Sequence, residues 1–451
     1  MVRTYAGSSQ LSSDGLGLAL APAMTPSGLV NVPSFFHGFA TNPLVLARGL
    51  VTLADITATR YFQFAPSNLR DPILTASGDR LRAECFSACN GVYARLDLLG
   101  SGFDGGEIGH GTTNVDLGTE MRAALTAVQR NELLHLDVGV DGLALATVDQ
   151  TTVERPVQMP ERWVRALGNA AQLQRELVAV VTLNTVESRA FVASLPPATS
   201  AVRSGWLTRS RSGVRLAALP TPGSVHLSGL HRLGAIKRVL THLTSITVYA
   251  PSDGTAGACL VTAELPGARL TLGLTADAAR GHSGEGSLLA SLAQDSVLED
   301  ADLISALLAF EPVIDVDALA RDAALSPERV RAGLAVLAAS GRVGWDAHDQ
   351  AYFHRELPDD PDRIDKDNPR LVAARKLVAE GAVRSEPDKP EVWRVTSGGV
   401  DYLVRADSTA DGALATRATC SCAWYLRHSG GRGACKHVLA VQLSPDAGTR
   451  A

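Results

Sequence analysis

The motifs Cys420-Ser421-Cys422 and Cys435-Lys436-His437, separated by the twelve residues 423–434, decide how the C-terminal part of this chain is expected to fold. Thiolate sulfur and neutral imidazole nitrogen are ligands that Zn²⁺ prefers, and structural zinc sites hold the ion with four of them in a tetrahedron. Two close pairs of such residues predict a single site whose ligands are Cys420, Cys422, Cys435 and His437. Because protein ligands then fill every position around the ion, none is left for a reactive water, and we expect the zinc to be structural.

The flanking residues predict the module that carries this site. Val392–Thr396 and Val400–Ala406 alternate as two strands around the turn Gly398-Gly399, which is typical of a β-hairpin. The apolar residues that follow His437 indicate a helix, and the N-terminus of that helix would stabilise the thiolate of Cys435. We therefore expect two strands and a helix to bring the four ligands together.

Two alternatives stay open at this stage. His428 lies within the spacer and is a second choice for the fourth ligand, although His437 is favoured because its pairing with Cys435 mirrors the first pair of cysteines. Cysteines are also often buried without any ligand. The three cysteines would then be small core residues, an interpretation that two closely spaced ligand pairs disfavour.

The four ligand positions resemble the SWIM zinc finger, whose pattern is Cys-x-Cys, a variable spacer and Cys-x-His. The resemblance covers roughly residues 390–443 and implies a β-β-α module that binds DNA or other proteins. The segment through Trp424 and Gly430-Gly431-Arg432-Gly433 looks like that of bacterial SWIM-finger proteins of similar length. This likeness implies a partner system of MoxR-type AAA+ ATPases and von Willebrand A-domain proteins, beside which such proteins are encoded.

Several side chains around the zinc motifs are suited to contact a nucleic acid or a protein partner: Arg417, Trp424, Arg427, Arg432 and Lys436. In one interpretation the cations form a phosphate-contacting patch and Trp424 stacks on exposed bases. In the other they form a solvated face and Trp424 packs beside the metal, because so small a module needs apolar mass. We favour the second interpretation for Trp424.

Composition limits the class of protein. The chain has 451 residues, so about 100–200 residues per domain predicts two to four domains. Apolar residues at 45% and charged residues at 20% are typical of globular proteins, and a net charge of −5 argues against a protein held on polyanions along its whole length. No stretch approaches the roughly 20 apolar residues of a membrane helix, and the cysteines make no disulfide framework. We expect a cytoplasmic protein without a membrane partner.

Hydrophobic patterning predicts an α+β multi-domain chain, with a mixed α/β N-terminal region, a winged-helix-like middle domain and a small C-terminal β-β-α zinc module. The expected units are an irregular arm at 1–45, an α+β domain at 46–175, a second α+β domain or subdomain at 176–298, a winged-helix-like domain at 299–356, a linker and short helix at 357–389, the zinc module at 390–443 and a tail at 444–451.

In the first α+β region, short apolar runs predict strands at Leu50–Leu53, Arg80–Phe86 and Val92–Leu99. Thr119–Arg130 carries apolar residues at helical spacing and predicts a helix. His110–Asn114, rich in residues that hydrogen-bond to their own backbone, is expected to form a turn rather than an active-site loop.

Residues 299–356 predict three helices and a two-stranded wing, the order of a winged helix-turn-helix. The third helix has Ser326 as N-cap and Pro327 at its first position, and it runs through Ala339. Eleven acidic residues oppose five basic ones in this unit. Since acidic groups repel phosphate, a protein-docking role is favoured over DNA reading.

Known catalytic motifs are missing from the sequence. The turn Gly281–Gly286 lacks the spacing of a nucleophile elbow, and there is no phosphate-binding loop, dinucleotide fingerprint or His-Glu-x-x-His. Cys85 and Cys89 lack nearby partners for a second metal site. The sequence therefore favours a non-catalytic zinc-binding adaptor that docks proteins, with a nucleic-acid-binding protein as the alternative.

Overall fold

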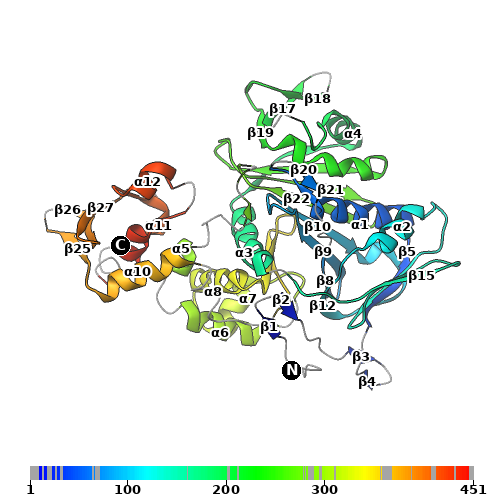
Figure 1. Cartoon of the computed structure of the whole chain (residues 1–451), viewed down its shortest axis with the longest axis horizontal. Helices are drawn as coiled ribbons and strands as arrows, with labels where there is room; N and C mark the ends of the chain where they lie inside the picture. Colours follow the sequence, from blue (N-terminus) through cyan, green and yellow to red (C-terminus); the bar gives the residue numbers. More distant parts are fainter. Residues whose placement is uncertain are drawn as a thin grey trace.

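The computed structural model confirms an α+β chain that combines helices with several antiparallel sheets (Figure 1). It describes residues 34–445 with short gaps, together with the short N-terminal hairpins β1 (Gln10–Ser12)–β2 (Gly15–Gly17) and β3 (Ala23–Thr25)–β4 (Gly28–Val30). Outside the described residues lie 1–9, 13–14, 18–22, 26–27, 31–33, 63–64, 67–71, 160, 201–203, 211–212, 278, 280, 283–288, 294–296, 309–310, 356, 358–367, 388, 408–412, 431–432 and 446–451. The connector predicted after residue 357 falls largely within these gaps.

The largest sheet has eight antiparallel strands. In spatial order they are β12 (His110–Asn114), β8 (Ile73–Ser77), β9 (Arg80–Phe86), β10 (Val92–Leu99), β22 (Ala268–Leu274), β21 (Cys259–Leu265), β20 (Ser245–Ala250) and β16 (Val178–Leu183). The strands predicted at 80–86 and 92–99 are confirmed. The sheet joins four strands from residues 46–175 to four from residues 176–298, so these two stretches share one core.

One face of this sheet is covered by α1 (Pro43–Thr57), which packs on β9 and β10. The strand predicted at Leu50–Leu53 is therefore wrong, because those residues lie inside α1. Nearly every side chain of α1 is buried, so the helix lacks the polar face that marks an amphipathic helix in a sequence. A short apolar run from such a helix looks like a buried strand, and Pro43 at the helix start was the signal that distinguishes them.

A second, five-stranded sheet has the order β11 (Phe103–Ile108), β5 (Ser34–Ala40), β13 (His135–Gly139), β14 (Gly142–Ala146) and β15 (Thr151–Glu154). Its strand β5 comes from the stretch in which an irregular arm is predicted. The turn predicted at His110–Asn114 is wrong, because these residues pair with β8 as an edge strand of the large sheet. The β-branched pair Thr112-Thr113 and the long-range ladder outweigh the turn-forming Gly111 and Asn114.

The remaining elements of the N-terminal region frame these sheets. They are β6 (Thr59–Arg60), β7 (Ala65–Pro66), the 3₁₀ turn η1 (Gly100–Gly102), α2 (Thr119–Ala127), α3 (Glu161–Arg175), α4 (Thr185–Ser194), a three-stranded sheet of β18 (Gly213–Ala217), β17 (Ser204–Ser210) and β19 (Val225–Ser228), and the 3₁₀ helices η2 (Leu230–Arg232) and η3 (Gly234–His242). The predicted helix at 119–130 is confirmed by α2, which ends three residues earlier.

The next unit follows the predicted order of three helices and a hairpin. After α5 (Leu289–Leu292) come α6 (Val297–Leu307), α7 (Val316–Ala323), α8 (Pro327–Ala339), β23 (Val343–Asp346) and β24 (Ala351–His354). The Ser326 hydroxyl accepts a hydrogen bond from the Arg329 N–H at 3.3 Å, as expected of an N-cap. This unit lies between the large sheet and the C-terminal module (Figure 1).

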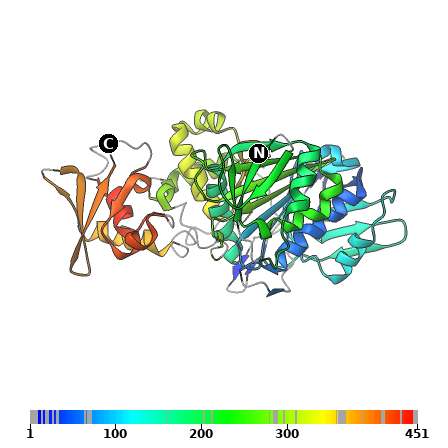
Figure 2. The same ribbon diagram turned by 90° about the horizontal axis from the view of Figure 1, so that it is seen from above.

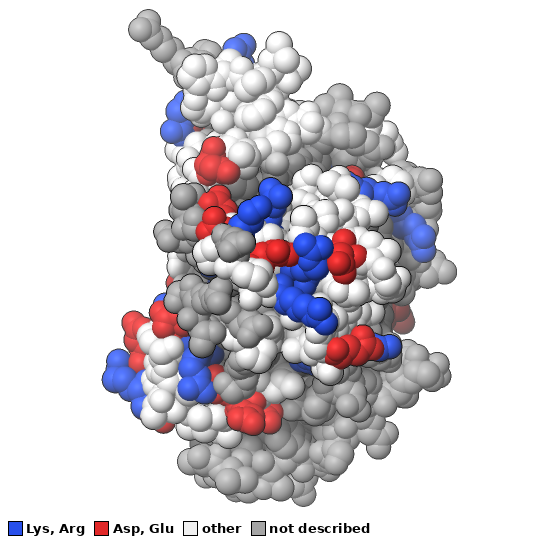
Figure 3. Space-filling view, turned by 90° about the vertical axis from the view of Figure 1, so that its left-hand side faces the viewer, with Lys and Arg blue, Asp and Glu red and all other residues white. Residues whose placement is uncertain are grey.

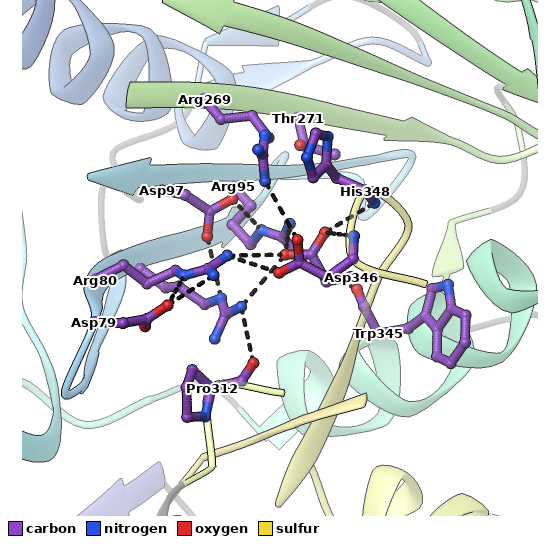
Figure 4. Close-up of polar contacts among 12 residues, drawn as sticks. Asp79, Arg80, Arg95, Asp97, Arg269, Thr271, Pro312, Trp345, Asp346 and His348 are labelled. Atoms are coloured by element: carbon purple, nitrogen blue, oxygen red, sulfur yellow. Dashed lines mark hydrogen bonds and ion pairs between the residues drawn. The ribbon is translucent and has the colours of Figure 1, made fainter. Parts of the chain in front are cut away.

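The β23–β24 hairpin is locked to the large sheet by buried ion pairs (Figure 4). Side chains alternate along β9, so Arg82 and Glu84 face the hairpin while Cys85 faces α1 and donates to the Leu53 carbonyl. Asp346, at the end of β23, accepts from Arg82 of β9 at 3.3 Å and pairs with Arg95 of β10 at 2.7 Å.

The C-terminal module stands at the far end of the molecule (Figure 2). It consists of α10 (Pro369–Ala379), a four-stranded sheet of β25 (Val383–Glu386), β26 (Lys389–Ser397), β27 (Val400–Ala406) and β28 (Ala418–Cys420), and the helices α11 (Leu414–Arg417), α12 (Ala423–His428) and α13 (Lys436–Gln442). The predicted hairpin and final helix are confirmed. Gln442 ties the module to the helical unit by donating to the Ala293 carbonyl at 2.6 Å. None of the described helices is both long and apolar enough to span a bilayer.

Candidate metal centre

Three element ends converge on the four predicted ligands. Cys420 is the last residue of β28, where it pairs with Val404 of β27. Cys422 is the N-cap of α12, Cys435 is the N-cap of α13, and His437 lies in the first turn of α13. The one-residue step between Cys420 and Cys422 therefore carries the chain from a strand end to a helix start, which directs both sulfurs to the same point.

The geometry of these side chains fits a tetrahedral ion. One ligand atom from each residue lies within 4.8 Å of all the others, and the four residues are buried. The Cys420 Sγ is 3.8 Å from the His437 Nδ1. Zn–S bonds of about 2.3 Å give a tetrahedron with edges of about 3.8 Å. The chain thus contains a four-residue cluster that can hold one metal ion, and its donors are those that zinc prefers.

Electrostatics within the cluster also suit a cation. A hydrogen bond with Cys420 lowers the pKa of the Cys435 thiol to about 4, and the same shared proton raises the pKa of Cys420. Burial raises the pKa of Cys422, although the Tyr425 N–H donates to its sulfur at 3.4 Å. Three thiolates this close repel one another, so a divalent cation is the partner that lets all of them ionise together.

Two residues that the sequence did not single out hold the ligands in place. The Tyr402 ring stacks on the His437 ring with centroids 4.2 Å apart, which fixes the orientation of the imidazole. Arg370 of α10 donates to the Ala434 carbonyl at 2.8 Å, next to Cys435. Tyr402 lies two residues from Val404 on the strand that pairs with Cys420, so strand alternation was a usable signal for it. Arg370 is distant in sequence and belongs to no motif.

The structure describes four of the five predicted contact residues, and two of these, both cations, bond to the module itself. Arg417 is half-buried and donates to the Asp407 carbonyl at 2.8 Å, and Lys436 donates to the Ser397 hydroxyl at 2.9 Å. Both cations thus bind the module itself.

Arg427 is exposed at the end of α12, and Arg432 lies outside the described residues. Trp424 is half-buried, with the Arg370 guanidinium 4.6 Å and the His428 ring 4.5 Å from its ring. His428 therefore lies against a tryptophan, and His437 is the histidine of the metal cluster. Seen from the module's end, the described Lys and Arg side chains are interspersed with Asp and Glu (Figure 3).

Comparison with known proteins adds little to this picture. No model of a known protein family and no curated protein matches the sequence. Among solved structures, the chain is similar to the proliferating cellular nuclear antigen of Entamoeba histolytica, with 14% identity and a TM-score of 0.36 over 54% of this chain and 99% of that one. It is also similar to a PCNA2–PCNA3 complex from Sulfolobus tokodaii, with 12% identity and a TM-score of 0.38 over 53% and 98% of the two chains.

Proposed function

We propose that this chain is a non-catalytic, zinc-binding adaptor that docks a protein partner through its C-terminal module. The zinc site supports this role because its four protein ligands leave no coordination position for a substrate. The ion would hold β28, α12 and α13 together and so present the surface of the module. The resemblance to SWIM-finger proteins suggests a MoxR-type AAA+ ATPase as the partner.

The main support for the proposal is the packing of α8 and of the β23–β24 hairpin against other parts of the chain. A winged helix reads DNA with its third helix and its wing. Here α8 is buried from Ala332 to Ala339, and the wing tip residue Asp346 is buried against the large sheet. Arg329 of α8 is bonded to Asp300 at 2.5 Å. The second half of α8 and the end of the hairpin are thus packed within the chain. The exposed start of α8 carries Glu328 beside Arg329 and Arg331, and Arg329 is bonded to a carboxylate, which favours a docking role over DNA binding for this unit.

Exposed apolar side chains on the module are suited to a protein partner. Leu426 on α12 is 71% exposed, and Val400 at the tip of the β26–β27 hairpin is 51% exposed. Leu426 is too exposed to contribute to the core, whereas burial of its side chain at an interface would be favourable.

The test compares two neighbours on α12. Leu426→Asp and Arg427→Ala are each mixed with a purified MoxR-type AAA+ ATPase from the same source, and binding is measured by biolayer interferometry. We expect Leu426→Asp to weaken binding at least about tenfold, the effect of losing one anchor residue. Arg427→Ala is expected to bind like the wild type. Absence of any complex with the wild type would remove this ATPase as the partner.

Nucleic-acid binding is the competing function, and it predicts the opposite ranking. Binding of labelled duplex and single-stranded DNA is measured by fluorescence anisotropy at about 50 mM salt, because phosphate contacts are strongest at low ionic strength. We expect no binding. Binding that falls steeply with added salt and is weakened by Arg427→Ala, but not by Leu426→Asp, would contradict the adaptor proposal.

A further inference from the structure

A cavity of about 510 Å³ lies in the N-terminal region, far from the zinc motifs in sequence. Its wall combines Tyr61 and Phe62 from the turn after α1 with His226 and Ser228 of β19, Arg232 of η2, and Ala276 after β22. Phe62 is 48% exposed, although it is a large apolar residue. The volume falls within the range of small-molecule sites, which is about 300–1,000 Å³.

Arg232 is the only lysine or arginine among the described lining residues, and its side chain is fully buried. A guanidinium has five N–H donors. Its Nη1 donates to the Gly91 carbonyl at 2.7 Å and to the Thr275 hydroxyl at 2.9 Å. Its Nη2 donates to the Ser228 and Thr275 carbonyls, each at 2.6 Å. These acceptors are all neutral, and the Nε has no partner among the described residues.

The charge of Arg232 is therefore not balanced by an ion pair. No carboxylate of the described residues lies within 4 Å of its guanidinium, and Asp277, the one acidic lining residue, is exposed. Burial lowers the pKa of Arg232, which shows how unfavourable the charged form is at this place. An arginine stays protonated in proteins, and the nearby Cys259, Cys89 and Asp277 offset only part of the cost of burying its charge. A bound anion would offset the rest.

The local backbone is shaped around this cation. Gly229 has φ of +104°, a conformation that favours glycine. A Cβ at Gly229 would lie 2.1 Å from the Arg232 Nε, so a larger residue would displace the guanidinium from the cavity wall. Burial also lowers the pKa of His226, which leaves that ring without charge at neutral pH. Among the described residues that line the cavity, Arg232 is therefore the one that carries a positive charge.

We propose that this cavity binds a small organic anion, whose carboxylate or phosphate lies next to Arg232 and whose ring or apolar body packs on Phe62. Because the Nη donors of Arg232 are all engaged within the chain, its charge would attract the oxyanion without a bidentate pair, and a carboxylate and a phosphate are both suited to this. The site would give the protein a ligand-binding function that is separate from its zinc module.

Isothermal titration calorimetry at low ionic strength tests the site with four probes. AMP and benzoate carry the two anions, and adenosine and benzamide are their neutral counterparts. We expect at least one anion to bind, and its neutral counterpart to bind at least about tenfold more weakly. The pair that shows the difference identifies phosphate or carboxylate as the preferred group.

Variants at Ala276 locate the binding without disturbing Arg232, whose removal would leave four buried acceptors without donors. Ala276 is exposed and lines the cavity. Ala276→Glu is expected to weaken anion binding about tenfold relative to the matched Ala276→Gln, because a like charge stands several ångströms from the ligand. Phe62→Ala should weaken it as well. The proposal is wrong if neither AMP nor benzoate binds at a concentration of about 10 mM. It is also wrong if Ala276→Glu and Ala276→Gln bind the anion with equal affinity.

Discussion

Two buried polar clusters in this molecule differ in where their opposite charge comes from. At the junction of the large sheet and the β23–β24 hairpin, Asp346 meets Arg82 and Arg95, and Asp97 accepts from both arginines at 3.1 and 2.8 Å. Burial disfavours the Asp346 carboxylate, but Arg95 and Arg82 outweigh it and hold its pKa far below the ordinary value. This cluster is complete as a set of protein charges.

The cysteine cluster is not complete in that sense. Its three cysteines can carry negative charge, its histidine is neutral as a metal ligand, and no lysine or arginine is among its four members. The comparison shows that burial alone does not reveal the role of a polar cluster. When both signs come from the chain, the cluster joins two units of the fold, and when only one sign is present, the cluster is a site for an ion.

The largest effect is expected when the cysteine cluster loses a ligand. Cys420→Ser and Cys435→Ser should abolish zinc binding and unfold the module, because structural zinc contributes about 10–16 kcal/mol of binding energy to such small domains. Elemental analysis should find about one zinc per wild-type chain. Loss of the module is measured as proteolysis within residues 390–443.

His428→Ala is the matched control, since this histidine lies in the same module but outside the cluster. It should keep its zinc, whereas His437→Ala should lose it. Freshly purified wild-type protein without any metal would show that the cluster is a set of buried thiols after all.

A smaller loss is expected when the self-balanced cluster loses its carboxylate. Asp346→Asn keeps the shape of the side chain but leaves Arg82 and Arg95 short of one negative charge, which should cost about 3–5 kcal/mol of folding stability. Urea unfolding of the N-terminal region measures this. Asp349→Asn is the control, because its side chain is 18% exposed and bonds to Arg80 at 2.8 Å, so the loss of its charge should cost less than that of the fully buried Asp346. Equal losses in the two variants would contradict the distinction.

Acid gives an independent check of the same carboxylate. The folded pKa of Asp346 is depressed, so its contribution to stability is present above the unfolded pKa of about 3.9 and is lost as the pH falls below it. Wild-type stability should therefore decline below about pH 4 more steeply than that of Asp346→Asn. Parallel curves for the two proteins would show that the carboxylate is not charged in the folded state.

The two clusters also differ in how well the sequence predicts them. The metal ligands lie within 18 positions of one another, at ends of short elements with clear turn and capping signals, so their types and spacing were sufficient. Arg82 and Asp346 are 264 residues apart and belong to no motif. Alternation along Arg80–Phe86 indicates a strand with a polar face, but no local pattern names the hairpin that covers it.

The errors in the fold have the same origin. The helix α1 was misassigned at Leu50–Leu53 because its burial on all sides comes from tertiary packing, which removes the amphipathic pattern. Edge strand β12 was missed because its pairing with β8 overrides the turn preference of its glycine and asparagine. The cavity beside Arg232 was also not foreseen, since it joins segments from four separate parts of the chain.

The smallest effect concerns the thiols outside the metal cluster, and it separates the two kinds of cysteine without unfolding the protein. Cys259 is buried, and burial raises its pKa to about 11, so only about one molecule in 10⁴ carries its thiolate at pH 7. Cys89 is half-buried, and although burial opposes ionisation, a hydrogen bond with Ser87 and further backbone bonds lower its pKa.

Zinc-loaded native protein should therefore react with iodoacetamide at Cys89 well before Cys85 or Cys259, because the thiolate is the reactive form and both of the others are buried. Mass spectrometry of the labelled peptides measures the order. After removal of zinc with a chelator, Cys420, Cys422 and Cys435 should become reactive, while the rate at Cys89 stays unchanged. If those three thiols react as readily before the chelator is added as after it, the bound zinc is held by other residues. The cysteine cluster would then not be the site at which a bound ion supplies the positive charge.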